Sequence, residues 1–116
     1  MNIMIVDDNA VIRATIRSML AELTDTFCEC TDGSEAVESY EAFHPDWVLM
    51  DIKMKQVDGF QATEAIRSAF PDAKVIIITQ YDDPKLKEKA RRVGANEFVL
   101  KEHLLDIEQI IRGDHN

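Results

Sequence analysis

The sequence predicts a single α/β domain in which a parallel sheet of five strands is covered by helices on both faces. Short apolar runs alternate with longer amphipathic segments along the whole chain, and such alternation is typical of repeated βα units. The chain has 116 residues, of which 46% are hydrophobic and 30% charged, as expected for one soluble globular domain. We therefore expect one (βα)5 domain over residues 1–116.

The predicted strands are short and contain few polar residues. Strands that are buried on both faces of a parallel sheet have nearly continuous apolar sequences. Right-handed crossovers through the intervening helices then produce a doubly wound sheet. The runs that fit this description are residues 3–6, 27–31, 47–50, 75–79 and 97–100.

The predicted helices lie after each strand, where apolar residues recur every three or four positions. Pro45 and Pro71 follow the second and third helices. Pro84 begins the fourth helix, and Gly94 is expected to cap its C-terminus. The apolar positions of the five helices are Ile12, Ile16, Met19 and Leu23; Ala36, Val37 and Tyr40; Phe60, Thr63, Ile66 and Phe70; Leu86, Ala90 and Val93; and Leu104, Ile107 and Ile111.

The charge and the cysteines exclude several classes of function. A formal net charge of -9 disfavours direct binding to nucleic acid or to an anionic membrane. No apolar run is long enough for a signal peptide or a membrane span, so we expect a cytoplasmic protein without membrane contact. Cys28 and Cys30 stand two residues apart on a predicted strand, which is poor disulfide geometry, and we expect both to be reduced.

Five polar residues lie at the C-terminal ends of the predicted strands. Asp7 and Asp8 follow the first strand, and Asp51 follows the third. Thr79 ends the fourth strand, and Lys101 follows the fifth. In a sheet of the flavodoxin-like order 2-1-3-4-5, ligands bind at this edge near the switch point between strands 1 and 3. We therefore expect the three aspartates to converge.

Converging carboxylates require a nearby positive charge. Two carboxylates about 4 Å apart repel each other by about 4 kcal/mol at an effective dielectric constant near 20. Hard oxygen ligands favour Mg²⁺, and Lys101 would add a fixed positive charge. With the hydroxyl of Thr79, these residues supply the nucleophile and the charges that phosphoryl transfer requires. Any one aspartate could instead be a helix N-cap, but their occurrence together at one edge favours a site.

In combination these residues resemble the receiver domain of bacterial response regulators, the phosphorylation switches of two-component signalling. The resemblance covers nearly the whole chain, and its motifs occur in the family's order. They are Ile5-Val6-Asp7-Asp8, Asp51-Ile52-Lys53-Met54 with Asp58-Gly59 downstream, Thr79, Gly94-Ala95, Phe98 and Val99-Leu100-Lys101.

The resemblance implies a phosphoryl acceptor and a metal site. Asp51 would accept the phosphoryl group from the phosphohistidine of a histidine kinase or of a phosphotransfer protein. Mg²⁺ would be held by Asp8, Asp51 and the backbone carbonyl of Lys53, with Asp7 acting through metal-bound water. The protein would catalyse only its own phosphoryl transfer and slow dephosphorylation, and so would be a switch rather than an enzyme.

The resemblance also implies how the switch works. Thr79 and Lys101 would bind the phosphoryl oxygens, and Phe98 would change rotamer as Thr79 moves toward the phosphate. That movement would remodel the face formed by the fourth helix, the fifth strand and the fifth helix. This face would then control a downstream protein target or a covalently linked output domain.

The sequence departs from the family pattern at three positions. Lys55 and Glu102 stand where proline is usual, which bears on the geometry of the two loops. Gln80 stands where a small residue is common, and together with Tyr81 and Lys53 it bears on the lifetime of the phosphorylated state.

A basic stripe on the fourth predicted helix is a candidate partner surface. Lys85, Lys89 and Arg92 are spaced for one helix face. Such a face is often simply solvated. Alternatively, it meets acidic residues such as Asp106 and Glu108 of a second copy after phosphorylation, which would make a phosphorylation-linked homodimer.

Other classes of function fit the sequence less well. A haloacid dehalogenase type of phosphohydrolase needs two aspartates separated by one residue, whereas Asp7 and Asp8 are adjacent. A flavodoxin-like carrier would have to bind phosphate beside this acidic pair. A phosphorylation-independent interaction module would have no need of Asp51 or Lys101. The chain ends soon after the fifth helix, at residues 113–116, which indicates a stand-alone receiver or the front of a longer regulator.

Overall fold

The computed structural model describes residues 1–113, so residues 114–116 of the C-terminal segment lie outside the described part of the chain. Five parallel strands form one sheet in the order β2-β1-β3-β4-β5. The predicted (βα)5 fold class and strand order are therefore confirmed. The strands are β1 (Asn2–Val6), β2 (Thr26–Cys30), β3 (Trp47–Asp51), β4 (Val75–Thr79) and β5 (Glu97–Leu100).

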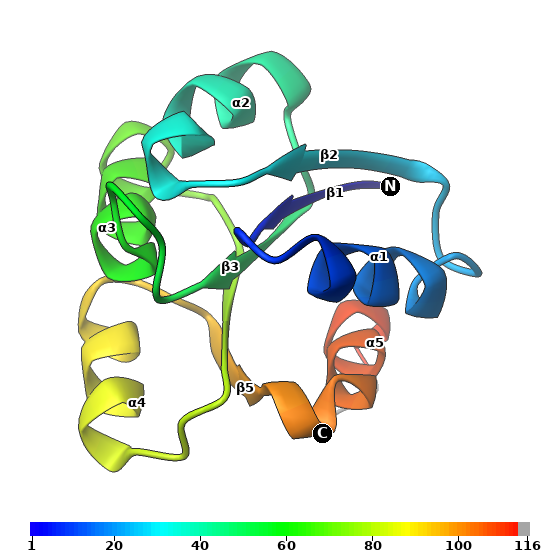
Figure 1. Ribbon diagram of the computed structural model, residues 1–116. Helices are drawn as coiled ribbons and strands as arrows, with labels where there is room; N and C mark the ends of the chain where they lie inside the picture. The colour runs from blue at the N-terminus through cyan, green and yellow to red at the C-terminus, as the bar shows by residue number, and fades with distance from the viewer. Residues whose placement is uncertain (114–116) are drawn as a thin grey trace.

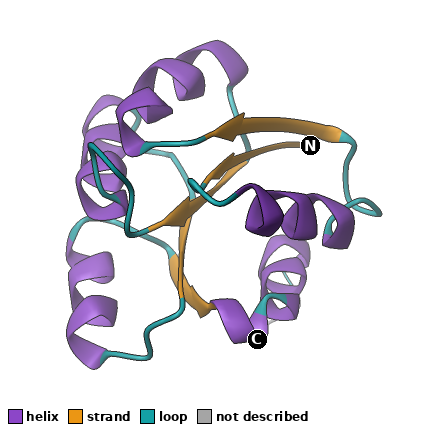
Figure 2. Ribbon diagram, viewed as in Figure 1, coloured by secondary structure: helices purple, strands orange, loops and turns teal. Residues whose placement is uncertain are grey.

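Helices cover both faces of this sheet (Figures 1 and 2). On one face lie the helices that run from cyan through green to yellow in Figure 1, α2 (Ala36–Phe43), α3 (Gly59–Ala69) and α4 (Pro84–Arg92). On the other face lie α1 (Ala10–Met19) and α5 (Leu105–Arg112). Short 3-10 turns at Gly33–Glu35 and Lys101–His103 precede α2 and α5.

The apolar core has two halves, one on each face of the sheet, because successive residues of a strand point to opposite faces. In β1, Met4 and Val6 pack on the side of α2, α3 and α4. Ile3 and Ile5 pack on the side of α1 and α5. All four side chains are fully buried, as the continuous apolar sequence predicts.

The ends of the elements follow local hydrogen bonds. The second strand ends at Cys30 rather than at residue 31, because the backbone N–H of Thr31 donates to Glu35 instead of to the sheet. Pro84 occupies the first turn of α4, as predicted. Gly94 follows the last residue of that helix with a φ of 98°, a left-handed conformation that glycine adopts without strain.

The structure also describes the two cysteines and the loop at Glu102, one of the positions that departs from the family pattern. Cys28 is half-buried and Cys30 buried, and neither forms a disulfide, as predicted. The peptide bond between Lys101 and Glu102 is trans, like every other bond in residues 1–113. In that part of the chain, none of the helices combines the length and apolar composition needed to cross a bilayer.

Ile76→Ala is expected to destabilise the protein by about 2 to 5 kcal/mol, since it leaves a cavity in the centre of the sheet. Ile76 is fully buried in β4. The control is Val11→Ala on α1, where the side chain is 72% exposed and the change should be within about 0.5 kcal/mol. Urea denaturation of both variants measures the two effects, and equal stabilities would contradict the assignment of the core.

Candidate functional site

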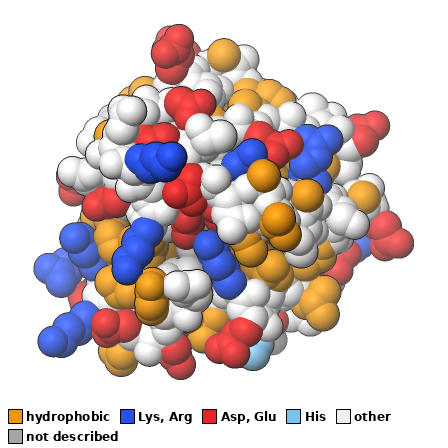
Figure 3. All heavy atoms as spheres, viewed as in Figure 1, with side chains coloured by type: hydrophobic (Ala, Val, Ile, Leu, Met, Phe, Trp, Pro, Cys, Tyr) orange, Lys and Arg blue, Asp and Glu red, His pale blue; other side chains and the backbone are white. Residues whose placement is uncertain are grey.

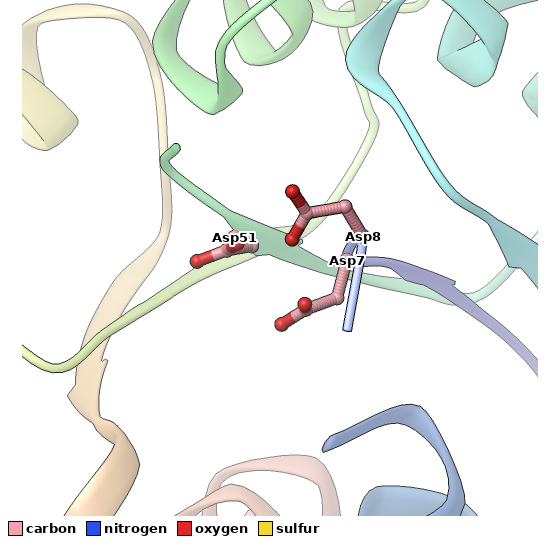
Figure 4. A group of neighbouring side chains, drawn as sticks. All are labelled: Asp7, Asp8 and Asp51. Carbon is pink, nitrogen blue, oxygen red and sulfur yellow. The ribbon is translucent and has the colours of Figure 1, made fainter. Parts of the chain in front are cut away.

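Three aspartates meet at the C-terminal edge of the sheet. β1 and β3 are neighbours, and Val6 is in register with Met50, so the residues that follow them lie side by side. One carboxylate oxygen from each of Asp7, Asp8 and Asp51 lies within 4.8 Å of the others. Figure 4 shows the three side chains reaching into the same space from the ends of β1 and β3. The predicted convergence is therefore observed.

Lys101 joins this group from the end of β5. Its Nζ lies 3.1 Å from Oδ1 of Asp51 and 3.3 Å from Oδ2 of Asp7. Both carboxylates are buried, whereas Asp8 is exposed. Three carboxylates against one ammonium leave an excess of negative charge in this group. Figure 3 shows acidic side chains between basic ones near the centre of the view.

This excess changes the proton affinity of the group. Burial raises the pKa of Asp51 above its ordinary value, the charge of Asp7 raises it further, and Lys101 offsets only part of the effect. Burial by itself would lower the pKa of Lys101, but the charges of Asp51 and Asp7 raise it overall. The site therefore holds a permanent ammonium and favours additional positive charge.

A small hollow of about 170 Å³ lies over these residues. Thr79 is buried at the end of β4 and lines the hollow. Its Oγ1 accepts a hydrogen bond from the backbone N–H of Tyr81 at 3.2 Å, and as a hydroxyl it can also donate to a ligand. The hollow is lined by Asp8, Asn9, Asp51, Lys53, Thr79, Gln80, Tyr81 and Lys101.

Lys53 and Tyr81 form a contact at the rim of the hollow. The Nζ of Lys53 donates to the Tyr81 hydroxyl at 3.2 Å and lies 4.6 Å from the centre of its ring. Hydrogen bonds from Gln80 and Lys53 lower the pKa of Tyr81 below its ordinary value. Gln80, Tyr81 and Lys53, which the sequence analysis connected with the lifetime of the phosphorylated state, thus lie in contact beside the acidic group.

Phe98 lies away from this hollow. It is half-buried on β5 and packs against the part of the core that faces α4. It also lines a second hollow of about 370 Å³ between α4 and β5. Of the predicted site residues, Asp7, Asp8, Asp51, Lys53, Thr79 and Lys101 therefore lie together, and Phe98 belongs to the neighbouring surface.

Arg13, Asp32 and Asn9 were not identified from the sequence as residues that support the site. Asn9 caps α1, and its N–H also donates to Oδ1 of Asp7 at 2.8 Å. The Arg13 guanidinium donates to the backbone carbonyl of Asp7 at 2.7 Å and pairs with Glu29 at 2.8 Å. No sequence signal distinguishes Arg13 from other helical arginines. Asp32 does have one, because it follows β2 at the same edge of the sheet.

The donor set fits a hard divalent cation. Carboxylate oxygens are the ligands that Mg²⁺ prefers, and it binds through only one or two of them while keeping several waters. Asp7, Asp8 and Asp51 supply enough oxygens within a short distance. The remaining hollow leaves room for a second, anionic ligand beside Lys101 and Thr79.

A family model matches this chain over nearly its whole length. The model describes the response regulator receiver domain and matches residues 3–112. The transcriptional regulatory protein DegU of Brevibacillus brevis is 34% identical over 102 residues, which cover 86% of this chain and 43% of DegU. The chemotaxis protein CheY of Halobacterium salinarum is 34% identical over 99 residues, covering 85% of this chain and 82% of CheY. The chain spans about half the length of the first transcriptional regulators that it matches.

Solved structures match the fold equally well. A chain of the crystal structure of the CheX-CheY-BeF3-Mg²⁺ complex from Borrelia burgdorferi has a TM-score of 0.89 and 26% sequence identity, covering 97% of this chain and 87% of that one. A DNA-binding response regulator of the LuxR family from Staphylococcus aureus has a TM-score of 0.87 and 25% identity, covering 99% of this chain and 98% of that one.

Asp51→Asn is expected to stabilise the metal-free protein at pH 7. The pKa of the Asp51 carboxyl is higher in the folded protein than in the unfolded chain. As pH rises, the folded protein therefore keeps the proton of Asp51 after the unfolded chain has lost it. The carboxylate therefore reduces stability as pH rises through the folded pKa, and has no such effect below the unfolded value. The gain of the variant should shrink as pH falls toward about 4.

Urea denaturation in the presence of a chelator, at several pH values, measures this difference. Asp46→Asn is the control, since it removes an exposed carboxylate that accepts the N–H of Asn2 at the opposite edge of the sheet. It should give no gain in stability at any pH. An Asp51→Asn variant that is less stable than wild type at pH 7 would contradict the electrostatic description of the site.

Proposed function

This chain belongs to the response regulator receiver domain family, and we propose that Asp51 is its phosphoryl acceptor. A carboxylate oxygen of Asp51 attacks the phosphorus of a phosphohistidine on a histidine kinase or a phosphotransfer protein. The new oxygen–phosphorus bond forms as the phosphorus–nitrogen bond breaks, and the imidazole keeps the electron pair. The observation that carries this proposal is the meeting of Asp51 with Asp7, Asp8 and Lys101 around one hollow.

The residues around Asp51 have separate roles in this transfer. Asp7, Asp8, Asp51 and the backbone carbonyl of Lys53 are proposed to hold Mg²⁺, Asp7 through a metal-bound water. When bound, Mg²⁺ supplies the positive charge that offsets the carboxylates and the incoming phosphoryl oxygens. Lys101, already 3.1 Å from Asp51, remains protonated and can bind a phosphoryl oxygen.

Thr79 and Phe98 are proposed to convert phosphorylation into a change of surface. The Thr79 hydroxyl would donate to a phosphoryl oxygen, and a hydrogen bond to a charged group is worth about 1.5 to 3 kcal/mol. That difference shifts a two-state equilibrium by about ten- to a hundredfold. Phe98 lines the hollow between α4 and β5, so a change in its rotamer would alter the surface formed by α4, β5 and α5.

The family places the protein among signalling switches, which argues against the phosphohydrolase and carrier alternatives. We propose that it acts in the cytoplasm and signals through a protein target or a covalently linked output domain. The second route is supported by the relatives of roughly twice this length, among them DegU. No direct nucleic acid binding by this domain is proposed, since its net charge is -9.

A phosphorylation-linked homodimer is proposed to use the basic side of α4, where Figure 3 shows lysines and arginines at the lower left. Lys85, Lys89 and Arg92 are all exposed, as the predicted stripe requires. However, Lys89 lies 4.8 Å from the centre of the Phe60 ring, and Arg92 lies 3.9 Å from Glu88. Lys85 is therefore the best placed of the three for a contact with another molecule.

The acidic side of the proposed dimer lies on α5. Glu108 already pairs with Arg112 at 3.1 Å within the chain. Asp106 is exposed in the first turn of the same helix. In a dimer with two-fold symmetry, a contact between Lys85 and Asp106 would occur twice.

Incubation with acetyl phosphate and Mg²⁺ is expected to add one phosphoryl group to the wild-type protein and none to Asp51→Asn. Intact-mass spectrometry measures the addition, and a chelator should abolish it. Asp46→Asn is the control and should be labelled like wild type. Full labelling of Asp51→Asn, or no labelling of wild type, would reject the acceptor assignment. The second outcome would favour a phosphorylation-independent interaction module.

Beryllofluoride, which mimics a phosphoryl group, is expected to increase the sedimenting mass of the wild-type protein in the presence of Mg²⁺. Lys85→Glu or Asp106→Lys alone should weaken this association by roughly tenfold, since each exposed pair is worth up to about 1 kcal/mol and occurs twice. The double variant should restore it. Identical masses with and without beryllofluoride at high concentration would eliminate the dimer.

A further inference from the structure

Asp32 lies between β2 and α2, at the same edge of the sheet as the acidic group, and its carboxylate is committed to backbone donors. The side chain is buried, with 8% of the residue exposed. It accepts hydrogen bonds from the N–H groups of Ser34 at 2.9 Å, Gln56 at 2.9 Å and Val57 at 3.2 Å. Two of these donors belong to the loop between β3 and α3.

The neighbouring glycine tightens the same contact. The N–H of Gly33 donates to the carbonyl of Val57 at 3.2 Å. A Cβ atom added to Gly33 would lie 2.5 Å from that carbonyl oxygen and 3.1 Å from the Cβ of Ala62. No side chain fits between the two loops at this distance. Asp32 and Gly33 thus hold residues 56 and 57 from one side through three hydrogen bonds.

The loop held in this way carries a proposed metal ligand. It begins directly after Asp51 and includes Lys53, whose backbone carbonyl is proposed to bind Mg²⁺. At its other end, the N–H of Gly59 donates to the carbonyl of Ile52 at 2.8 Å. The loop is therefore fixed by Gly59 at its base and by Asp32 at its far side, and Lys53 lies between these two points.

The contact is independent of pH near neutrality. Hydrogen bonds from the backbone N–H groups of Gln56 and Ser34 hold the pKa of Asp32 well below its ordinary value, so the side chain is a carboxylate whenever the protein is folded near pH 7. Asp32 lies outside the group formed by Asp7, Asp8 and Asp51. It is therefore not one of the converging carboxylates, and its hydrogen bonds to Gln56 and Val57 connect it to the site through the loop.

We propose that Asp32 is a positioning residue that fixes the Lys53 carbonyl for the metal and thereby sets the affinity of the site for Mg²⁺. This inference rests on the proposed function, because it needs a cation at Asp51. Residues that orient metal ligands without contacting the metal typically contribute about 10- to 100-fold in affinity. Asp32→Ala is accordingly expected to raise the dissociation constant for Mg²⁺ by at least about tenfold.

The test is a calorimetric titration of the unphosphorylated protein with MgCl2, with hydrogen exchange at residues 53–57 as a second readout. Asp32→Asn keeps one carboxamide oxygen as an acceptor and should retain part of the affinity. The affinity for Mg²⁺ should therefore decrease from wild type to Asp32→Asn and again to Asp32→Ala. Exchange in the loop should rise in the same order. Asp46→Asn controls for loss of an acidic residue.

Ile76→Ala controls for loss of stability, since it weakens the core without touching either loop, and it should bind Mg²⁺ like wild type. If it loses as much affinity as Asp32→Ala, the effect is one of stability and the inference is wrong. Wild-type affinity in a folded Asp32→Ala variant would also overturn it. If Asp32→Ala does not fold, the Asp32→Asn variant is used instead, and wild-type affinity for Mg²⁺ in that variant would overturn the inference.

The inference and the proposed function fail in different ways. If wild type binds no Mg²⁺ and takes no label from acetyl phosphate, the proposed function fails, and this inference fails with it. If wild type binds Mg²⁺ and is labelled, but both Asp32 variants bind Mg²⁺ as tightly, then only the positioning role is wrong.

Discussion

Lys101 lies 3.1 Å from Asp51 and 3.3 Å from Asp7, and the charge balance among these three residues governs the rest of the site. Two buried carboxylates at the ends of neighbouring strands repel each other, and one ammonium from a third strand offsets only part of that repulsion. Removal of Lys101 would leave both carboxylates without this ammonium, and loss of one partner from a buried charge pair typically costs about 3 to 5 kcal/mol. The same imbalance is what supports the proposed binding of a cation at this edge.

The carboxylates keep their positions because the loops that carry them are tied to the rest of the fold. Asp7 is held from one side by the N–H of Asn9 and, through its carbonyl, by Arg13. The loop after Asp51 is held from the other side by Asp32. None of these three residues supplies the charge of the central group. Asn9 and Arg13 bind Asp7 directly, and Asp32 binds the loop that follows Asp51. Preorganisation of this kind is what makes electrostatic interactions effective at a reacting centre.

The site is connected to the protein surface through β4 and β5. Thr79 ends β4 and is in register with Leu100 of β5, and Ile77 is in register with Phe98. Thr79 and Phe98 therefore lie on directly paired strands. On the outer side, Lys89 of α4 packs over the ring of Phe60 of α3. The same helix thus has a fixed contact with the core and an exposed basic side, which suits a surface that responds to the site.

The sequence alone determined the fold class and the residues of the acidic group, since both depend on local pattern. The predicted strand order came with the flavodoxin-like fold class rather than from any one segment, and the strand pairing confirms it. Apolar runs define strands, and the carboxyl ends of parallel strands share one edge, so Asp7, Asp8, Asp51, Thr79 and Lys101 could be assigned to one place. Four strand ends differ by one residue from the predicted ranges: the start of β1, both ends of β2 and the end of β3. The end of β2 has a local cause, because a side-chain acceptor, Glu35, took the N–H of Thr31.

Only the tertiary structure decided which side chains reach one another across the edge. The bond of Arg13 to the Asp7 carbonyl, the contact of Lys53 with Tyr81 and the bonds of Asp32 to the loop after Asp51 join segments far apart in sequence or depend on side-chain direction. The pairing of Arg92 with Glu88 and that of Glu108 with Arg112 likewise depend on rotamers that periodicity does not specify. Spacing places a residue on a face or at an edge, whereas packing of the whole chain selects its partner.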